Sequence, residues 1–92
     1  MLERAITDKI IERLKKEPNC FVRKIHGGAY QSAGLPDIIA CKDGKFIGLE
    51  VKRPGGKATT LQKVTLKAIE SSGGICGIVY SVEDVEKILE LM

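Results

Sequence analysis

The sequence feature that most constrains the fold is the pair Asp43-Gly44, which separates two largely apolar stretches. Asp-Gly is favoured in two-residue type I′ turns, because the twist of such a turn matches that of the strands it joins. The flanking stretches, 37–42 (DIIACK) and 45–52 (KFIGLEVK), are rich in the β-branched and apolar residues typical of strands. The sequence therefore predicts a tight β-hairpin.

The two-residue turn also fixes which hairpin residues face each other. With Lys42 opposite Lys45, Asp37 is expected opposite Glu50, and directly opposed residues have Cβ atoms only ~4.5–5.5 Å apart. Lys52 lies two residues beyond Glu50 and shares its face, because side chains alternate along a strand. The other face receives an apolar set suited to a core: Ile38, Ala40, Ile47, Leu49 and Val51.

Two facing carboxylates should destabilise the strand pair unless something resolves their repulsion. One carboxyl group could be protonated, Lys52 could neutralise part of the charge, or a divalent cation could lie between the two acids. Hard oxygen ligands suit Mg²⁺ or Mn²⁺, and a lysine beside them could orient an attacking water and stabilise charge on a phosphate. The alternative is a surface Pro-Asp turn beside an exposed Glu-Lys strand end; the register favours the metal site.

The rest of the chain predicts three helices and two further strands. Pro18-Asn19 ends the first helix, Thr59 or Thr60 caps the second, and Gly73-Gly74 ends it. The run ICGIVY is typical of a strand covered on both faces. Besides the hairpin, the predicted elements are a helix over 2–16, a strand over 20–26, a loop over 27–34, a helix over 60–72, a strand over 75–80 and a last helix from residue 81. The order αβββαβα indicates an α/β domain with a mixed central sheet flanked by helices.

Both terminal helices have an apolar stripe at helical spacing. The first stripe is Leu2, Ile6, Ile10 and Leu14. In the last helix, Ser81 and Asp84 form a predicted capping box, and the residues expected to face inward are Val85, Ile88, Leu89 and Met92.

Glu3 projects within about 20° of the first stripe, and a carboxylate aimed at a core is costly unless it is paired or metal-bound. Gly48 leaves room for a helix to approach the face of Asp37 and Glu50. Glu3 is therefore a candidate third acid, with a solvated first-turn glutamate as the alternative.

Length and composition indicate one globular domain over residues 1–92, since 43% of the residues are hydrophobic and 29% charged. No apolar run reaches the ~18 residues that a membrane helix needs, so no membrane partner is expected. Three cysteines without CxxC spacing argue against disulfides or zinc and for a reduced, cytoplasmic setting, and all three are interpreted as small buried residues.

The net charge of +3 is too small to prove a nucleic-acid partner, although the basic residues crowd the middle of the chain. An ordinary solvated face would look similar. Few aromatic residues are present, so a stacking platform for single strands is poorly supported. Residues predicted to contact DNA are Lys24, His26, Arg53, Lys57 and Lys63, although a lone histidine is more often structural. Gln62 could contact a phosphate or a metal-bound water, or could simply be a surface residue.

Three motifs in this order resemble the PD-(D/E)xK nuclease superfamily, in particular the stand-alone VRR-NUC domains of phage and bacterial proteins. The short (D/E)xK element alone is weak, but the full set is specific and its resemblance covers almost the whole chain. The three letters that name the family read here as Val51-Lys52-Arg53, with the lysine that the superfamily chemistry requires. The motifs are Gly34-Leu35-Pro36-Asp37, Glu50-Val51-Lys52-Arg53-Pro54-Gly55 and Leu61-Gln62, preceded by Glu3.

The resemblance implies a restriction-endonuclease-like fold and a role for each matching residue. Asp37, Glu50 and the main-chain carbonyl of Val51 would hold Mg²⁺ or Mn²⁺, with Glu3 reaching it directly or through water. Lys52 would be the catalytic lysine, and Gln62 would contact water or phosphate. The activity implied is endonucleolytic hydrolysis of branched DNA, as in a homodimeric Holliday-junction resolvase of a bacterial or phage-infected cell, without a nucleotide cofactor.

Other functions stay open. A non-catalytic DNA-binding module would be expected to lack one of the acids or the lysine, and all three are present. A sequence-specific restriction enzyme normally needs added elements to reach base edges, and 92 residues leave little room for them. A general nuclease, or one acting on single strands or RNA, remains an alternative.

Overall fold

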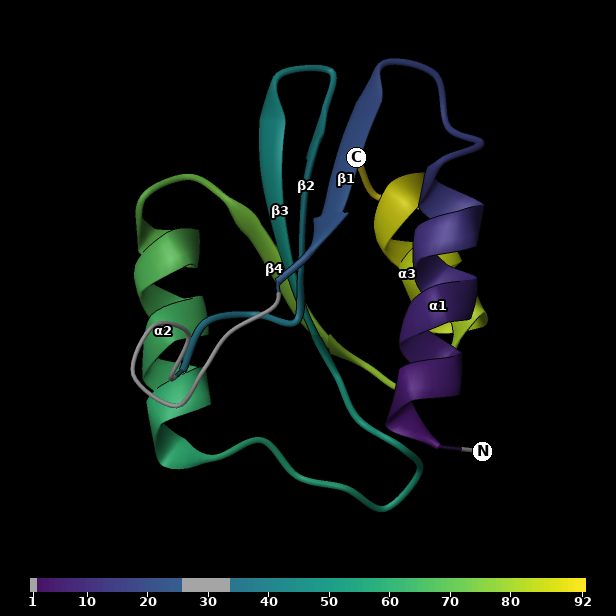
Figure 1. Cartoon of the computed structure of the whole chain (residues 1–92). Coiled ribbons are helices and arrows are strands. Elements are labelled where there is room, and N and C mark those ends of the chain that lie inside the picture. Colours follow the sequence, from purple (N-terminus) through teal and green to yellow (C-terminus); the bar gives the residue numbers. More distant parts are fainter. Residues whose placement is uncertain (1, 26–33) are drawn as a thin grey trace.

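The computed structural model describes residues 2–25 and 34–92. The predicted order αβββαβα is confirmed (Figure 1). The predicted loop over 27–34, apart from Gly34, and His26 lie outside the described residues. The elements are α1 (Glu3–Leu14), β1 (Cys20–Lys24), β2 (Ile38–Lys42), β3 (Lys45–Val51), α2 (Thr60–Ser71), β4 (Ile75–Val79) and α3 (Val82–Glu90).

The four strands form one mixed sheet in the order β1-β2-β3-β4, with β1, β2 and β3 antiparallel and β4 parallel to β3. The predicted hairpin register is confirmed, because Lys42 pairs with Lys45 and the ladder continues to Ile38 and Leu49. Asp43 and Gly44 have φ angles of 52° and 81°. A type I′ turn requires positive φ at both central residues, which the Asp-Gly pair accommodates.

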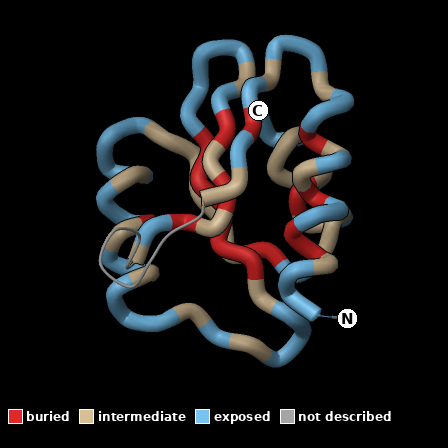
Figure 2. The backbone as a smooth tube through the Cα atoms, viewed as in Figure 1, coloured by how far each residue is buried: buried red, intermediate tan, exposed pale blue. Residues whose placement is uncertain are grey.

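The helices cover the two faces of the sheet unequally (Figure 1). α1 and α3 contact each other and lie on one face, whereas α2 lies alone on the other and contacts β3 and β4. The main core fills the space beneath α1 and α3, and Figure 2 shows buried residues along the sheet and the inner side of α1. β3 is central and buried without interruption from Ile47 to Val51. Its C-terminal end is therefore a fixed platform for side chains.

The apolar hairpin face is confirmed as core, since all five predicted residues are at most 2% exposed. In α1 the stripe is buried from Ile6 onward, but Leu2 is 70% exposed, because the first turn extends past the core. The inward position predicted for Met92 is wrong, since α3 ends at Glu90 and the chain end is exposed. Val85 is the residue of α3 that is fully buried.

β4 is contacted on both faces, by α2 on one and α3 on the other, as predicted, although it is only half-buried over most of its length. It lies at the edge of the sheet and pairs with β3 alone. The prediction of three buried cysteines is wrong: Cys20 and Cys76 are half-buried, and Cys41 is exposed. Cys41 lies on the sheet face opposite to that of Ala40 and pairs with the exposed Phe46 of β3.

The predicted helix signals act at the ends of α2 and α3. Thr59 is the N-cap of α2, and Gly73, with a φ of 97°, follows its last turn and donates to the Glu70 carbonyl. Gly adopts this left-handed conformation without the steric penalty of a Cβ. The capping box predicted for α3 is half formed: Ser81 accepts from the Asp84 amide, while the Asp84 carboxylate accepts from the Tyr80 amide instead.

Candidate active site

The predicted acids and lysine meet at one end of the sheet. Asp37 immediately precedes β2, Glu50 is the next-to-last residue of β3, and Lys52 follows it. The neighbouring strands are tied to the same end, because the Ile25 amide donates to the Asp37 carbonyl over 2.8 Å and the Lys52 amide to the Val79 carbonyl over 3.0 Å. The backbone of all four strands thus holds the three side chains in place.

Glu50 is the centre of this group and is only 1% exposed. Its Oε2 accepts a hydrogen bond from Gln62 Nε2 at 2.9 Å and lies 3.4 Å from Lys52 Nζ. Among the described residues, its Oε1 is buried and has no hydrogen-bond partner. A buried carboxylate oxygen without a partner carries a substantial desolvation penalty. The described protein atoms therefore leave one buried oxygen of Glu50 without a hydrogen-bond partner.

Asp37 joins the group through the backbone rather than through a strand pair. The prediction placed it directly opposite Glu50, but the ladder ends one residue earlier, at Ile38 and Leu49. Asp37 Oδ2 instead accepts from the Val51 amide at 2.7 Å. A strand residue presents its N–H and C=O to the same side, so the Val51 carbonyl is expected on the side of Asp37. Both carboxylates and this carbonyl then border one space.

The charge state of Glu50 reflects this crowding. The pKa of Glu50 is raised to about 7. The largest cause is the loss of hydration on burial, and hydrogen bonding with Asp37 and repulsion by its carboxylate add to it. The positive charge of Lys52 partly opposes the rise. Lys52 thus neutralises part of the charge, as one of the predicted resolutions required, and the raised pKa makes protonation of Glu50 easier than in a free chain. A proton on Glu50 near neutral pH is one that a cation could displace.

Two glycines and a proline place Asp37. Pro36 is buried and packs over Gly48, where a Cβ would come within 3.0 Å of Pro36 Cγ and 3.4 Å of Ile69 Cδ1. Gly34 has a φ of 80°, and a Cβ there would meet Leu61 Cγ at 2.6 Å. The GLPD motif therefore needs glycine and proline to pass between α2 and β3. The room predicted at Gly48 is filled by Pro36 and α2, not by α1.

Gln62 belongs to both the site and the helix cap. Its Oε1 accepts from the Thr59 amide at 2.8 Å, and its own amide donates to Thr59 Oγ1 at 3.2 Å, which completes a capping box. Its remaining polar group, Nε2, donates to Glu50. The side chain is half-buried, so it is not the plain surface glutamine of the alternative interpretation. The T-x-x-Q spacing signals the cap, whereas the contact with Glu50 depends on how α2 docks.

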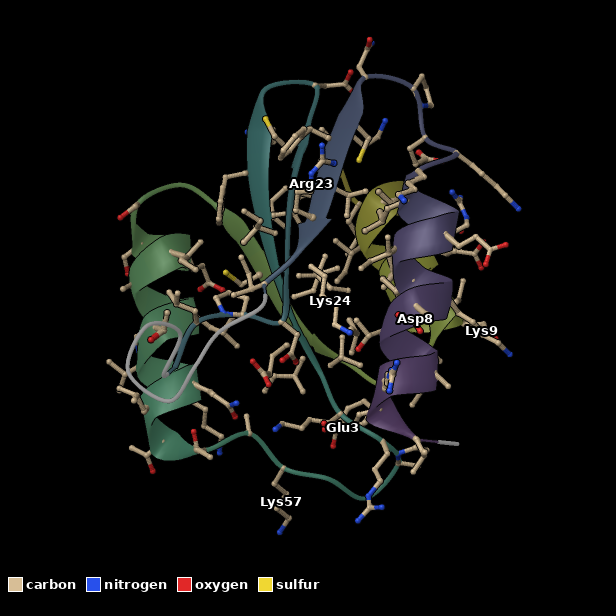
Figure 3. All side chains as sticks on the ribbon, in the orientation of Figure 1. Glu3, Asp8, Lys9, Arg23, Lys24 and Lys57 are labelled. Carbon is tan, nitrogen blue, oxygen red and sulfur yellow. The ribbon has the colours of Figure 1, made fainter. Side chains whose placement is uncertain are left out.

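Glu3 is exposed, so the interpretation of a carboxylate aimed at the core is wrong, and the alternative of a solvated first-turn glutamate fits the exposure. It lies in the first turn of α1, beside the exposed Leu2, and Figure 3 shows its side chain projecting from that turn toward the middle of the view. Across the described residues, no three acidic, histidine or cysteine side chains lie close enough to hold a metal ion. Glu3 is thus not preassembled with Asp37 and Glu50.

The remaining donor set still suits a hard divalent cation. It consists of oxygens only, and one of them, Glu50 Oε1, is buried without a partner in the described structure. Mg²⁺ is commonly held by one or two carboxylates while it keeps several waters and meets substrate phosphates. Two carboxylates and one carbonyl fit that pattern, whereas they would be a poor cage for an ion held by protein alone.

Basic residues surround the same end of the sheet. Lys24 ends β1 opposite Ile38, and Arg53 and Lys57 are exposed in the connection from β3 to α2. Figure 3 shows Lys57 pointing away from that connection. Lys63 is exposed on α2 and lines a hollow with Glu70, farther along the helix. His26, the fifth predicted DNA contact, lies outside the described residues.

Comparisons with known proteins identify the fold. No family model matches the sequence, and no curated protein gives a significant match. A solved structure of a VRR_NUC domain superimposes with a TM-score of 0.77 at 23% identity, over 96% of this chain and 94% of that one. A VRR_NUC domain protein gives a TM-score of 0.78 at 16% identity, over 99% and 87% of the two chains. The resemblance predicted from the motifs is thus confirmed at the level of the fold.

Proposed function

We propose that this chain is a Mg²⁺- or Mn²⁺-dependent endonuclease that hydrolyses phosphodiester bonds in branched DNA. The coarse assignment, a nuclease-like domain, rests on the fold shared with the two VRR_NUC structures. The observation that carries the proposal is Glu50: a buried carboxylate with one unpartnered oxygen among the described residues, next to Asp37 and 3.4 Å from the Lys52 ammonium.

Each residue has a distinct part in the proposed reaction. Asp37, Glu50 and the Val51 carbonyl would hold the cation, with Glu3 contributing through water. When bound, the ion supplies Lewis-acid stabilisation of the phosphate and a more acidic water. Lys52 has three N–H donors. One is directed to Glu50, which leaves the others for the attacking water and a non-bridging phosphate oxygen.

The bond changes follow from this placement. A water oxygen bonds to phosphorus and gives up a proton to solvent, the bond from phosphorus to the 3′ oxygen breaks, and the leaving oxygen takes up a proton from solvent. The products carry a 5′ phosphate and a 3′ hydroxyl. Gln62 holds Glu50 in position and can contact the phosphate or a bound water. Preorganised charges of this kind stabilise the transition state because they need no reorganisation during the reaction.

The DNA backbone would cross the end of the sheet where the acids lie. Lys24, Arg53 and Lys57 can neutralise phosphates on either side of the scissile bond, with Lys63 and His26 extending the contact. Such contacts position the duplex without reading its sequence. Binding that relies on them weakens steeply with salt.

We propose four-way junctions as the preferred substrate and a homodimer as the active form. One site cuts one strand, so paired cuts need two sites. A C2 dimer relates its two sites by a two-fold axis, which matches the near two-fold symmetry of a four-way junction. A general nuclease for single strands or RNA is the alternative that the substrate comparison below addresses.

The proposal is tested by incubating the protein with labelled four-way junction, flap, duplex and single-stranded DNA, and with RNA, in Mg²⁺, Mn²⁺ or EDTA. Lys52→Met removes the ammonium, and Lys16→Met, in the exposed turn that follows α1, is the matched control. We expect metal-dependent paired cuts in the junction from the wild type and the control, and none from Lys52→Met.

Equal cutting of all substrates would keep the chemistry and overturn the junction preference. Binding without cutting by the wild type would favour a non-catalytic DNA-binding module. Full activity of Lys52→Met would contradict the role of the lysine.

A further inference from the structure

We propose that Thr59, a residue outside the acidic centre, positions that centre by dictating which end of the Gln62 amide faces Glu50. The inference rests on the proposed metal-dependent nuclease, because its consequence is the shape of the cation site. It is carried by three hydrogen bonds that share the Gln62 side chain and backbone: Thr59 N to Oε1, Gln62 N to Thr59 Oγ1, and Nε2 to Glu50 Oε2.

The first step is the identity of the two ends of the amide. A glutamine side chain has one acceptor end, Oε1, and one donor end, Nε2. The Thr59 amide can only donate, and it lies 2.8 Å from Oε1. The acceptor end is therefore taken by the helix cap. Nε2 is the end that remains for Glu50, which lies 2.9 Å away.

The second step is the orientation of the carboxylate. Glu50 Oε2 is shared by the Gln62 amide and the Lys52 ammonium. This fixes Oε2 toward α2 and Lys52 and leaves Oε1 as the oxygen without a partner among the described residues. If the amide were turned over, Oε1 of Gln62 would face the carboxylate and repel it. The cap thus turns the donor end of Gln62 toward Oε2, so that Oε1 is the oxygen left for the proposed cation.

The third step is the position of Thr59 in the chain. Thr59 is the N-cap residue between β3 and α2, and its Oγ1 accepts from the backbone amide of Gln62 at 3.2 Å. The donor to Gln62 Oε1 is the backbone N–H of Thr59, so the side chain acts by closing the cap that holds this N–H against Oε1. Thr59 itself is exposed, so its substitution removes a hydrogen bond without opening the core. Residues that orient metal ligands from behind typically affect metal affinity 10–100-fold when changed. Thr59 acts through Gln62, so about a tenfold effect, the low end of that range, is expected.

The experiment is a calorimetric titration of the metal-free, full-length protein with Mn²⁺ at one pH. Thr59→Val keeps the shape of the side chain and removes its acceptor, whereas Thr59→Ser keeps the acceptor. Ser81→Ala is the matched control, since it deletes the same kind of cap from α3, with no hydrogen bond to Gln62 or Glu50 in the described structure. We expect about a tenfold loss of Mn²⁺ affinity for Thr59→Val, with Thr59→Ser and Ser81→Ala close to wild type.

Wild-type affinity in Thr59→Val, or an equal loss in Ser81→Ala, would overturn the inference. A second readout does not need the metal: the side-chain NH₂ signals of Gln62 in the metal-free protein, followed by NMR. The two amide protons are distinct in any glutamine, but the hydrogen bond to Glu50 displaces the signal of the bonded proton. The signals should move toward free-glutamine positions in Thr59→Val but not in Ser81→Ala. Unchanged signals would refute the positioning role. Absence of Mn²⁺ binding by the wild type, with the expected signal change, would instead count against the proposed function alone.

Discussion

Glu50→Gln is expected to stabilise the metal-free protein above neutral pH while it abolishes cleavage. The pKa of Glu50 is raised from 4.5 to about 7, and each pKa unit corresponds to about 1.4 kcal/mol. The folded protein therefore loses on the order of 3 kcal/mol when Glu50 must ionise. Glutamine avoids this loss, because its oxygen can accept from Gln62 and its amide can donate to Asp37. The pKa of about 7 already includes the attraction to Lys52, so the expected net gain is the full value, on the order of 3 kcal/mol.

The sign follows from proton linkage. Between pH 4.5 and about 7 the unfolded chain releases the Glu50 proton while the folded chain retains it, so the stability of the wild type falls as pH rises. Below pH 4.5 both states are protonated, and wild type and Glu50→Gln should be nearly equal. Above pH 7 the full difference should be present.

Urea unfolding in EDTA at several pH values from 4 to 8.5 measures this difference, with Glu12→Gln on the exposed side of α1 as the matched control. We expect the variant to be favoured increasingly from pH 4.5 to 7 and the control to follow the wild type. A Glu50→Gln protein less stable than wild type at pH 8, or a difference that does not vary with pH, would refute the reasoning.

Three further predictions concern two glycines that pack near or far from the site and the binding of Mn²⁺. Gly48→Ala brings a Cβ within 3.0 Å of Pro36 and should lower the free energy of unfolding by about 1–3 kcal/mol. It should also lower the cleavage rate, because a shift of Pro36 displaces Asp37. Unchanged cleavage kinetics would contradict the role of Pro36. Gly73 has a φ of 97°, and a Cβ there would meet no other atom. Gly73→Ala should therefore lower the free energy of unfolding by about 1–2 kcal/mol through backbone strain alone. Cleavage should be unchanged, because Gly73 lies at the other end of α2 from Gln62, and denaturation and cleavage kinetics measure the two effects. Mn²⁺ at about 100 times its Kd should stabilise the wild type by about 2.7 kcal/mol and Glu50→Gln hardly at all. A wild-type melting temperature that added Mn²⁺ does not raise would argue against the site.

The hairpin and its register could be predicted because they depend on local chemistry. The Asp43-Gly44 turn fixes the pairing of β2 and β3, and the alternation of side chains then assigns Ile38 and Leu49 to the core and Glu50 to the other face. The contact between Lys52 and Glu50 follows from the same alternation. No long-range information was needed for these features.

The features that the sequence did not predict depend on how distant segments dock. The helical stripe places Glu3 in line with Ile10, but only the packed structure shows that the core begins one turn later, at Ile6. The apolar composition of β4 gave no sign that it lies at the sheet edge. The contact of Gln62 with Glu50 requires α2 to lie against β3, and Gly48 admits Pro36 there rather than α1.

The most direct test of the acidic centre is a crystal structure of the protein grown with Mn²⁺, with the ion located by its anomalous scattering. The account predicts a peak bonded to Glu50 Oε1, to Asp37 and to the Val51 carbonyl, with water in the remaining positions. A Mn²⁺ ion bound elsewhere, with Glu50 Oε1 still without a partner, would contradict it.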